Sequence, residues 1–332
     1  MKIMVLGLGS WGIALACLLS ENGHDILIWA RSGEKIREVE KNRESSEYLP
    51  EIKIPEEISF TDNLSLAAEA DVILSCLPSR AVRDVFTALN PFLKTGHVVV
   101  SASKGLEDGT LLCLSEVISD VVPHTRVCVL SGPSHAEEVS RKIPTTCVLA
   151  AGDLGLAKQI QAIFHNAYFR VYTNSDVLGV ELGGALKNVI SLAAGISDGM
   201  GNGDNTKAAL MTRGIAEISR LGIEMGARLE TFFGLSGIGD LIVTCTSMHS
   251  RNRRAGILLG QGKTLQETLA EVHMVVEGVH TAKAAKALAD KHDVRMPIIE
   301  EINMTLFCGK DPRQAVIDLM TREMTDENRV KN

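Results

Sequence analysis

The sequence predicts an α/β protein with an N-terminal doubly wound sheet and an all-helical C-terminal domain. Two observations lead to this prediction. Short runs rich in Val, Ile and Leu alternate with helical stretches up to about residue 174, and long helical patterns then take over. Because helices are the usual crossover between parallel strands, the alternating part predicts a largely parallel sheet covered on both faces. The change of pattern predicts two domains, residues 1–174 and 175–332.

Each predicted strand is a short apolar run. In order they are KIMVLG (2–7), DILIWA (25–30), DVILSCL (71–77), VVVSAS (98–103), VCVLSG (127–132), TTCVLAA (145–151) and FRVYTN (169–174). A helix to about Glu21 follows the first run, and another spans about Glu34 to Lys41. From Ser175 on, helical periodicity continues through the rest of the chain, which predicts a second domain without strands.

Size and charge limit the classes of function. At 332 residues and 45% hydrophobic, the chain exceeds the size at which one core usually divides in two. The formal charge of -7 and the pI near 5.8 provide no basic field. We therefore expect no nucleic-acid partner and no binding to an acidic membrane surface.

The cysteines and the N-terminus point to a cytoplasmic protein. The seven cysteines are scattered, with no CxxC pair and no metal-ligand spacing with histidine. This pattern predicts reduced core thiols and no metal site. The first strand begins at Lys2, and Gly7 and Gly9 interrupt it too early for a signal-peptide core. No longer stretch is typical of a membrane span.

A glycine-rich loop follows the first predicted strand. Gly7, Gly9, Ser10, Trp11 and Gly12 form a GxGxxG pattern that opens the first helix. Such glycines allow a tight turn and let a pyrophosphate approach backbone N–H groups at the positive helix N-terminus. The pattern predicts a dinucleotide site in a Rossmann-like domain, and the alternative is a glycine turn without a ligand.

The end of the second strand indicates which dinucleotide binds. An NAD-specific site usually has an acidic residue there, to accept from the ribose 2'-hydroxyl. Here the strand ends in Trp29, Ala30 and Arg31, and Asp25 lies at its start, far from the ligand. Arg31 could pair with a 2'-phosphate and stack on adenine, which favours NADPH while leaving NADH usable. The alternative is a solvated surface arginine.

The helix ELGGALKNVISLAAGI (181–196) has two different faces. One carries large apolar side chains, and the other carries Gly184, Lys187, Asn188, Ser191 and Gly195. Small residues around one lysine let a flat ligand come close, and partial desolvation would lower the lysine pKa toward a value useful for proton transfer. An amphipathic helix with a surface lysine is the alternative.

Two further segments are typical of ligand contacts. The stretch GLSGIGDLIVTCTSMHSRNRR (234–254) joins a turn holding Asp240 to Ser250, Arg251 and Asn252 at the start of a helix. A serine, an arginine, an amide and a helix N-terminus suit a phosphate dianion, although the run could be a charged helix start. Lys104 and the segment SGPSHA (131–136) follow strands at the carboxyl edge of the sheet, where ligands bind in such folds. Each could instead be a plain turn.

Together these residues resemble the bacterial-type NAD(P)-dependent glycerol-3-phosphate dehydrogenase family over essentially the whole chain. The resemblance rests on motifs in family order: GLGSWG (7–12), SKGLE (103–107), SGPSHAEEV (131–139), ELGGALKNVI (181–190), GLSGIGDLIVTC (234–245), SRNRR (250–254) and VVEG (275–278). It implies reversible reduction of dihydroxyacetone phosphate to sn-glycerol 3-phosphate with NADPH or NADH, for glycerophospholipid synthesis. It also suggests a homodimer, as does the abundance of helix surface in the second half.

The resemblance also assigns residues. Lys187 is the implied proton donor and acceptor, and Lys104 and Asp240 orient the substrate and tune that lysine. The implied substrate contacts are Lys104, Gly132, Ser134, Lys187, Asp240, Ser250, Arg251 and Asn252. The implied NADPH contacts are Ser10, Trp11, Arg31, Lys104, Ala136, Arg251, Val275 and Glu277, beside the loop glycines. His135 fills a place where the family often has an aromatic ring.

Two other functions compete with this one. A dehydrogenase of similar layout could act on a 3-hydroxyacid or on ketopantoate, because a fold does not fix a substrate. The cluster beginning at Ser250 argues against it, since such substrates carry no phosphate. A nucleotide-binding regulator without catalysis would not need Lys104, Lys187 and Asp240 together.

Overall fold

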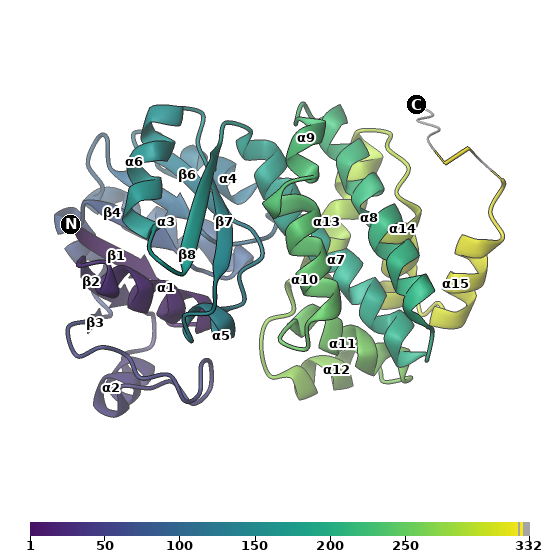
Figure 1. The fold of residues 1–332 in the computed structure, drawn as a ribbon, viewed down its shortest axis with the longest axis horizontal. Coiled ribbons are helices and arrows are strands. Elements are labelled where there is room, and N and C mark those ends of the chain that lie inside the picture. The colour runs from purple at the N-terminus through teal and green to yellow at the C-terminus, as the bar shows by residue number, and fades with distance from the viewer. Residues whose placement is uncertain (325, 328–332) are drawn as a thin grey trace. The chain divides into compact units, whose positions relative to one another are not determined.

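The chain folds into two compact units, drawn in Figure 1 from the computed structural model, which describes residues 1–324, 326 and 327. The first unit comprises Met1–Lys104 and Leu112–Glu181, and the second comprises Gly105–Leu111 and the chain from Leu182 on. The division after Glu181 falls within a helix, and the domain boundary at residue 174 stays a prediction. Positions 325 and 328–332 of the predicted second domain lie outside the described residues.

The first unit is built on one sheet in the order β3-β2-β1-β4-β5-β6-β7-β8. The strands are β1 (Lys2–Leu6), β2 (Asp25–Trp29), β3 (Ser59–Thr61), β4 (Val72–Ser75), β5 (Val98–Ser101), β6 (Arg126–Ser131), β7 (Thr145–Ala150) and β8 (Phe169–Asn174). Neighbours pair in parallel except β6 and β7, which are antiparallel. The doubly wound fold is confirmed, and β3 is the one strand among these that the apolar runs did not predict.

Helices cover both faces of the sheet. They are α1 (Ser10–Glu21), α2 (Gly33–Asn42), α3 (Val82–Leu89), α4 (Leu114–Val121), α5 (Ala136–Val139) and α6 (Leu154–Phe164), with short 3-10 turns η1 (Leu64–Glu69), η2 (Ser79–Ala81) and η3 (Asn90–Phe92). Successive side chains of β1 alternate between two cores: Ile3 and Val5 pack with α1 and α6, while Met4 and Leu6 pack with α3 and α4. Burial on both faces explains why the strands are continuous apolar runs.

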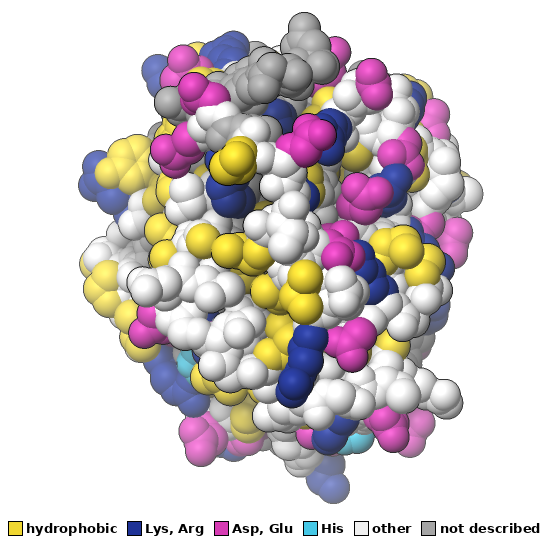
Figure 2. Space-filling model, turned by 90° about the vertical axis from the view of Figure 1, so that its right-hand side faces the viewer, with side chains coloured by type: hydrophobic (Ala, Val, Ile, Leu, Met, Phe, Trp, Pro, Cys, Tyr) yellow, Lys and Arg dark blue, Asp and Glu magenta, His cyan; other side chains and the backbone are white. Residues whose placement is uncertain are grey.

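From Leu182 on, the described residues of the second unit form helices joined by turns and loops, without a strand, as predicted. Its elements are α7 (Val177–Gly199), whose first residues belong to the first unit, α8 (Asp204–Glu224), α9 (Leu229–Phe232), the π-turn η4 (Leu235–Gly239), α10 (Asp240–Thr246), α11 (Arg251–Gly260), α12 (Leu265–Val272), α13 (Glu277–Lys291), α14 (Pro297–Phe307) and α15 (Pro312–Met320). Figure 2 shows the side of the molecule on the right in Figure 1. There basic and acidic side chains are interspersed rather than gathered by sign.

Helix α7 is the central helix of the second unit. Both faces of the predicted amphipathic pattern are buried, since Leu186 is 0% exposed and Lys187 only 5%. By length and composition alone, α7 and the stretch Leu229–Thr246 meet the criterion for a membrane span, which core helices of soluble proteins also meet. For α7 the reason is its burial, because a helix packed on all sides within a protein carries few charged side chains.

The cysteines are free thiols. Cys113, Cys128, Cys147 and Cys245 are buried, as expected for core thiols, and burial raises the pKa of Cys245 to about 12. Cys308 is exposed at the end of α14, so the expectation of core burial is wrong there.

Candidate active site

The predicted dinucleotide loop has the geometry that its glycines require. Gly7 has φ +123°, and its N–H donates to the carbonyl of Trp29 at 2.9 Å. A Cβ atom on Gly12 would lie 2.1 Å from the oxygen of Gly7, so only glycine fits there. At Gly9, by contrast, an added Cβ would meet no described atom within 4 Å. The loop is therefore closely packed at Gly7 and Gly12, whereas Gly9 leaves space beside the backbone.

The start of α1 suits a pyrophosphate. Gly9 is its N-cap and supplies no side-chain cap, and the first turn carries no acidic residue. The buried Nε1 of Trp11 has no hydrogen-bond partner in the described part of the chain. Buried donors are rarely left unpaired, so this N–H fits a contact with a bound cofactor. The hydroxyl of Ser10 donates to the carbonyl of Tyr48 at 2.6 Å, which holds the 45–49 turn beside the loop.

Arg31 lies at the end of the sheet where an adenosine is expected. It is exposed two residues after β2, directly before Ser32, the N-cap of α2. Asp25 lies at the opposite end of the same strand. No carboxylate therefore stands in β2 at the position where NAD-specific sites have one.

Lys104, Gly132 and Ser134 come together in the first unit. Lys104 follows β5, and its ammonium donates to the carbonyl oxygen of Gly132 at 3.1 Å. The hydroxyl of Ser134 donates to the same oxygen at 3.0 Å. Gly132 has φ +133°, and an added Cβ would lie 3.1 Å from the Cα of Cys147, so glycine is required after β6. Ala136, the first residue of α5, is buried close by in the chain.

Lys187 and Asp240 form a buried ion pair in the second unit. The ammonium of Lys187 hydrogen-bonds to Oδ1 of Asp240 and, at 2.6 Å, to the hydroxyl of Thr244. The lysine and aspartate side chains are 7% and 2% exposed. The ion pair and the hydroxyl hold the ammonium in one place, which a group that delivers a proton needs.

Thr244 was missed from the sequence. It lies one turn after Asp240 on α10, and its hydroxyl also donates to the backbone carbonyl of Asp240 at 2.6 Å. The i, i+4 spacing that puts the two side chains on one helix face was the available signal. Threonine is so common inside helices that this spacing alone does not single it out.

The start of α11 is held against α7 by small polar side chains. Ser250 is the N-cap and accepts from the N–H of Arg253, and its hydroxyl lies 3.1 Å from that of Ser191 on α7. Asn252 donates to Oδ1 of Asn188 at 3.0 Å. The first turn carries no acidic residue, so its N–H groups and dipole favour an anion.

Arg251, Val275 and Glu277 complete the predicted set in this unit. Arg251 is the first residue of α11 and Glu277 the first of α13. The N–H of Gly278 donates to Oδ1 of Asn252 at 2.8 Å and so ties the starts of these helices together. Val275, just before α13, is 40% exposed. Among the described residues, no group of three His, Cys, Asp or Glu side chains could hold a metal ion.

This fold and these residues define a class. Two-domain dehydrogenases bind a nicotinamide dinucleotide on a Rossmann-like sheet and carry proton-transfer groups on a helical domain. This chain has a sheet of that kind and, in its helical unit, a buried lysine–aspartate pair.

The comparisons with known proteins narrow the class to one family. Residues 2–157 match the N-terminal domain of NAD-dependent glycerol-3-phosphate dehydrogenase, and residues 176–317 match its C-terminal domain. The chain is 53% identical to glycerol-3-phosphate dehydrogenase (NAD(P)+) of Fusobacterium nucleatum, over 97% of each protein. It is 49% identical to that of Bacillus subtilis, over 98% of this chain and 96% of the relative.

A solved structure agrees. Glycerol-3-phosphate dehydrogenase from Coxiella burnetii superposes with a TM-score of 0.94 at 37% identity, over 97% of this chain and 99% of the other. The chain belongs to the NAD(P)-dependent glycerol-3-phosphate dehydrogenase family.

Proposed function

We propose that this chain interconverts dihydroxyacetone phosphate and sn-glycerol 3-phosphate with NADPH or NADH, and so supplies the backbone of glycerophospholipids. The observation that carries the proposal is a single hydrogen-bond network in the second unit. The hydroxyl of Ser191 donates to the carbonyl of Thr244 at 2.9 Å and meets the hydroxyl of Ser250 at 3.1 Å. Ser191 thus joins the surroundings of Lys187 to the N-terminus of α11.

The substrate needs two groups that are held close together. In dihydroxyacetone phosphate, one carbon and one ester oxygen separate the reacting carbonyl from the phosphorus. A proton donor and a phosphate anchor must therefore stand close together on one rigid support. Lys187 and Ser250 meet this need because Ser191, buried and 0% exposed, links their helices. A 3-hydroxyacid or ketopantoate would leave the anchor unused.

Different residues bind the phosphate, transfer the proton and orient the proton donor in this proposal. The N–H groups of α11, with Ser250, Arg251 and Asn252, bind the phosphate, and Lys104, Gly132 and Ser134 are the proposed contacts from the first unit. Lys187 gives its proton to the carbonyl oxygen as negative charge develops there, and takes it back in the reverse reaction. Asp240 and Thr244 fix the direction of the ammonium. When bound, the nicotinamide supplies the hydride that reaches C2.

The first unit holds the cofactor in this proposal. Gly7, Gly9, Ser10, Trp11 and Gly12 receive the pyrophosphate at the start of α1, with Ala136 beside them. Arg31 pairs with the 2'-phosphate, so NADPH is favoured and NADH is accepted. Arg251, Val275 and Glu277 are the proposed contacts from the second unit.

The charge of the chain and its family support proposals for its localisation, oligomeric state and partners. We place it in the cytoplasm as a homodimer, with a phosphorylated small molecule as its substrate. The net charge of -7 and the mixed charges of the face in Figure 2 argue against nucleic acid and acidic membranes as partners.

Replacing Lys187 with Met tests the proposal. The change deletes the proton while keeping much of the stem volume, and general acid catalysis is worth roughly a hundred- to ten-thousandfold. Loss of the cation beside the forming alkoxide adds to this, so turnover should fall at least about a thousandfold. NADPH binding, followed by fluorescence, should barely change. Single-turnover reduction of dihydroxyacetone phosphate is the measurement.

The buried ion pair requires a second variant. Met at position 187 leaves the Asp240 carboxylate buried without its partner, which destabilises proteins strongly. The pair Lys187→Met with Asp240→Asn removes both charges and should fold better, but stay inactive. Lys187→Arg should not restore the rate, because a guanidinium keeps its proton.

Lys310→Met is the matched control, since Lys310 is paired with Glu301 and Asp318 outside the site. Activity of Lys187→Met within tenfold of the parent, with NADPH bound, would exclude this role.

A further inference from the structure

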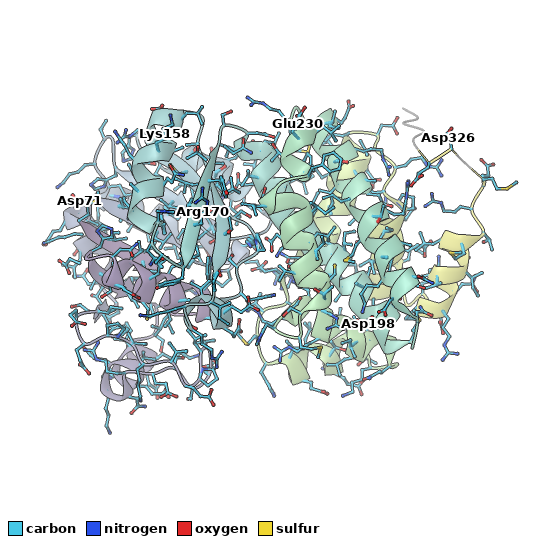
Figure 3. All side chains as sticks on the ribbon, in the orientation of Figure 1. Asp71, Lys158, Arg170, Asp198, Glu230 and Asp326 are labelled. Atoms are coloured by element: carbon cyan, nitrogen blue, oxygen red, sulfur yellow. The ribbon has the colours of Figure 1, made fainter. Side chains whose placement is uncertain are left out.

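Arg253 is a basic residue of the cluster Ser250–Arg254, and each of its three guanidinium nitrogens has a partner within the protein. It lies in the first turn of α11, and its side chain is only 13% exposed. Its Nε donates to Oδ2 of Asp198 at 2.9 Å, and its Nη2 lies 2.7 Å from the same oxygen. Asp198, labelled in Figure 3, stands in the last turn of α7. The guanidinium therefore binds α11 to α7 through a charge-assisted fork.

The remaining nitrogen of the guanidinium holds the loop ahead of α11. Nη1 donates to the carbonyl oxygen of Thr246 at 3.0 Å and to the sulfur of Met248 at 2.9 Å. Thr246 ends α10, and Met248 lies in the 247–250 loop, which leads into Ser250. One side chain thus contacts the start and the middle of the loop that delivers Ser250.

The side chain of Arg253 is already engaged within the protein, and it shares its carboxylate partner with Lys207. Oδ2 of Asp198 meets Arg253, and Oδ1 lies 2.9 Å from the ammonium of Lys207 on α8. All three side chains are less than one-fifth exposed. Arg253 is therefore committed to Asp198 and the loop, rather than offered to a phosphate.

Glycines bring the two helices close enough for this contact. An added Cβ at Gly195 of α7 would lie 2.2 Å from the carbonyl oxygen of Arg253, and one at Gly256 of α11 would lie 2.3 Å from that of Leu192. Gly199 and Gly260 repeat the pattern one turn later. The helices touch backbone to backbone, as in membrane helix pairs with small residues four apart. This contact fixes how far α11 stands from α7.

We propose that Arg253 and Asp198 are positioning residues for the phosphate of the substrate, an inference that rests on the proposed function. They hold the 247–250 loop and the first turn of α11 so that Ser250 and Arg251 meet the phosphate together. Their loss loosens the grip on the phosphate while Lys187, whose ammonium is held by Asp240 and Thr244 and not by Arg253, keeps its place. The effect should therefore depend on the phosphate.

The test compares dihydroxyacetone phosphate with unphosphorylated dihydroxyacetone. Arg253→Met should lower kcat/KM for the phosphorylated substrate by about 30- to 100-fold, mostly through KM, because displacing a binding group by about 1 Å can cost that much. For dihydroxyacetone the change should stay within about threefold. Arg253→Lys can keep the Asp198 pair but not all the loop contacts, so it should lose about tenfold.

Coupling between the two residues provides the second readout. Asp198→Asn should lose about tenfold with the phosphorylated substrate, and its combination with Arg253→Met should be no worse than Arg253→Met alone, as expected for residues acting as one unit. Arg220→Met is the matched control, because Arg220 donates to the carbonyl of Arg295 at 3.0 Å and so holds a different loop of the same unit. It should lower the thermal unfolding temperature without changing the preference for the phosphorylated substrate.

The outcomes separate the inference from the proposed function. Equal losses with both substrates, or no loss in the Arg253 and Asp198 variants, would overturn the positioning role. If Arg253→Met does not fold, the positioning role is tested with Arg253→Lys and Asp198→Asn. The quantity compared is again the ratio of kcat/KM for dihydroxyacetone phosphate to kcat/KM for dihydroxyacetone. Arg251→Ala serves as the reference for a direct phosphate contact. A wild-type protein that does not reduce dihydroxyacetone phosphate would instead refute the proposed function.

Discussion

Two pairs of helix N-termini in this protein differ in how they are completed. In α4 and α14 a buried glutamate from another helix accepts the first N–H groups. Glu181 accepts from the N–H of Ser115 at 2.9 Å, and Glu217 accepts from that of Ile298 at 3.0 Å. In α1 and α11 no acidic residue stands in the first turn, and Gly9 and Ser250 are the N-caps.

Under the proposed function, this difference separates helices with a structural role from those that bind ligands. A helix N-terminus carries unpaired N–H groups and partial positive charge, so it favours any nearby anion. Where the protein supplies a carboxylate, that capacity is used for packing. At α1 and α11 it remains for a pyrophosphate and a phosphate, the two anionic groups that the proposed function requires.

Among the changes that test this comparison, a carboxylate placed at the N-terminus of α11 should have the largest effect on activity. Aspartate is as good an N-cap as serine, so Ser250→Asp should keep the helix. Its charge would repel the phosphate and remove one contact, and we expect kcat/KM for dihydroxyacetone phosphate to fall at least about a hundredfold. Steady-state kinetics with dihydroxyacetone, which should change little, shows whether the loss belongs to the phosphate.

A matched substitution checks that the effect is local. Thr264 is the N-cap of α12 and accepts from the N–H of Glu267, as Ser250 does from that of Arg253. Thr264→Asp should leave kcat/KM unchanged for both dihydroxyacetone phosphate and dihydroxyacetone. A comparable loss there would mean that an added charge anywhere in the helical unit impairs the enzyme.

Arg31→Asp should have a smaller effect, confined to the cofactor. An attraction to the 2'-phosphate becomes a repulsion, while the pyrophosphate at α1 is untouched. One charge-assisted contact is worth about 1.5 to 3 kcal/mol, or roughly ten- to a hundredfold. The Michaelis constant for NADPH should rise by at least that factor, and that for NADH much less. Equal rises for both cofactors would exclude a pairing of Arg31 with the 2'-phosphate.

Substitution of Glu217 should have the smallest effect on the active site. It tests the other half of the comparison, a helix N-terminus that is completed by a buried glutamate. Burial raises its pKa from 4.5 to about 7, against the lowering effect of the N–H groups of Ile298 and Ile299. The folded protein therefore keeps this proton at pH values where the unfolded chain has lost it. The stability gained from the proton is complete below pH 4.5 and is lost as the pH rises through 7.

Glu217→Gln should remove this dependence. Urea unfolding of the parent should show a free energy of unfolding that falls by about 1 to 3 kcal/mol from this group between acidic and neutral pH. The variant should show a flatter curve and unchanged activity at pH 6. Parallel curves for the two proteins would show that Glu217 titrates alike in the folded and unfolded chains.

The sequence predicted features that lie within one continuous segment. The loop from Gly7 to Gly12 is one such case, because its turn, its glycines and the following helix are consecutive. The strands are another, since burial on both faces leaves a plain apolar run. The antiparallel pairing of β6 with β7 is outside such patterns, because strand direction depends on where the chain returns. At three residues, β3 is too short to show a pattern.

Features that join distant residues could not be predicted in this way. Lys187 and Asp240 are 53 positions apart, and only the family resemblance paired them. The pairing of Asp198 with Arg253 depends on how closely α7 and α11 approach, which is set by glycines on both helices. In the sequence, Glu217 resembles any charged helix residue. Its burial follows from the packing of α8 against α14.

The most direct test of the central claim is the oxidation of NADPH, followed by the absorbance of the reduced nicotinamide, with a panel of carbonyl substrates. Dihydroxyacetone phosphate should be reduced rapidly, and unphosphorylated dihydroxyacetone more slowly by at least about a hundredfold, because it cannot use the N-terminus of α11. Reduction with NADH should also be measurable. Faster reduction of ketopantoate or a 3-oxoacid than of dihydroxyacetone phosphate would contradict the account.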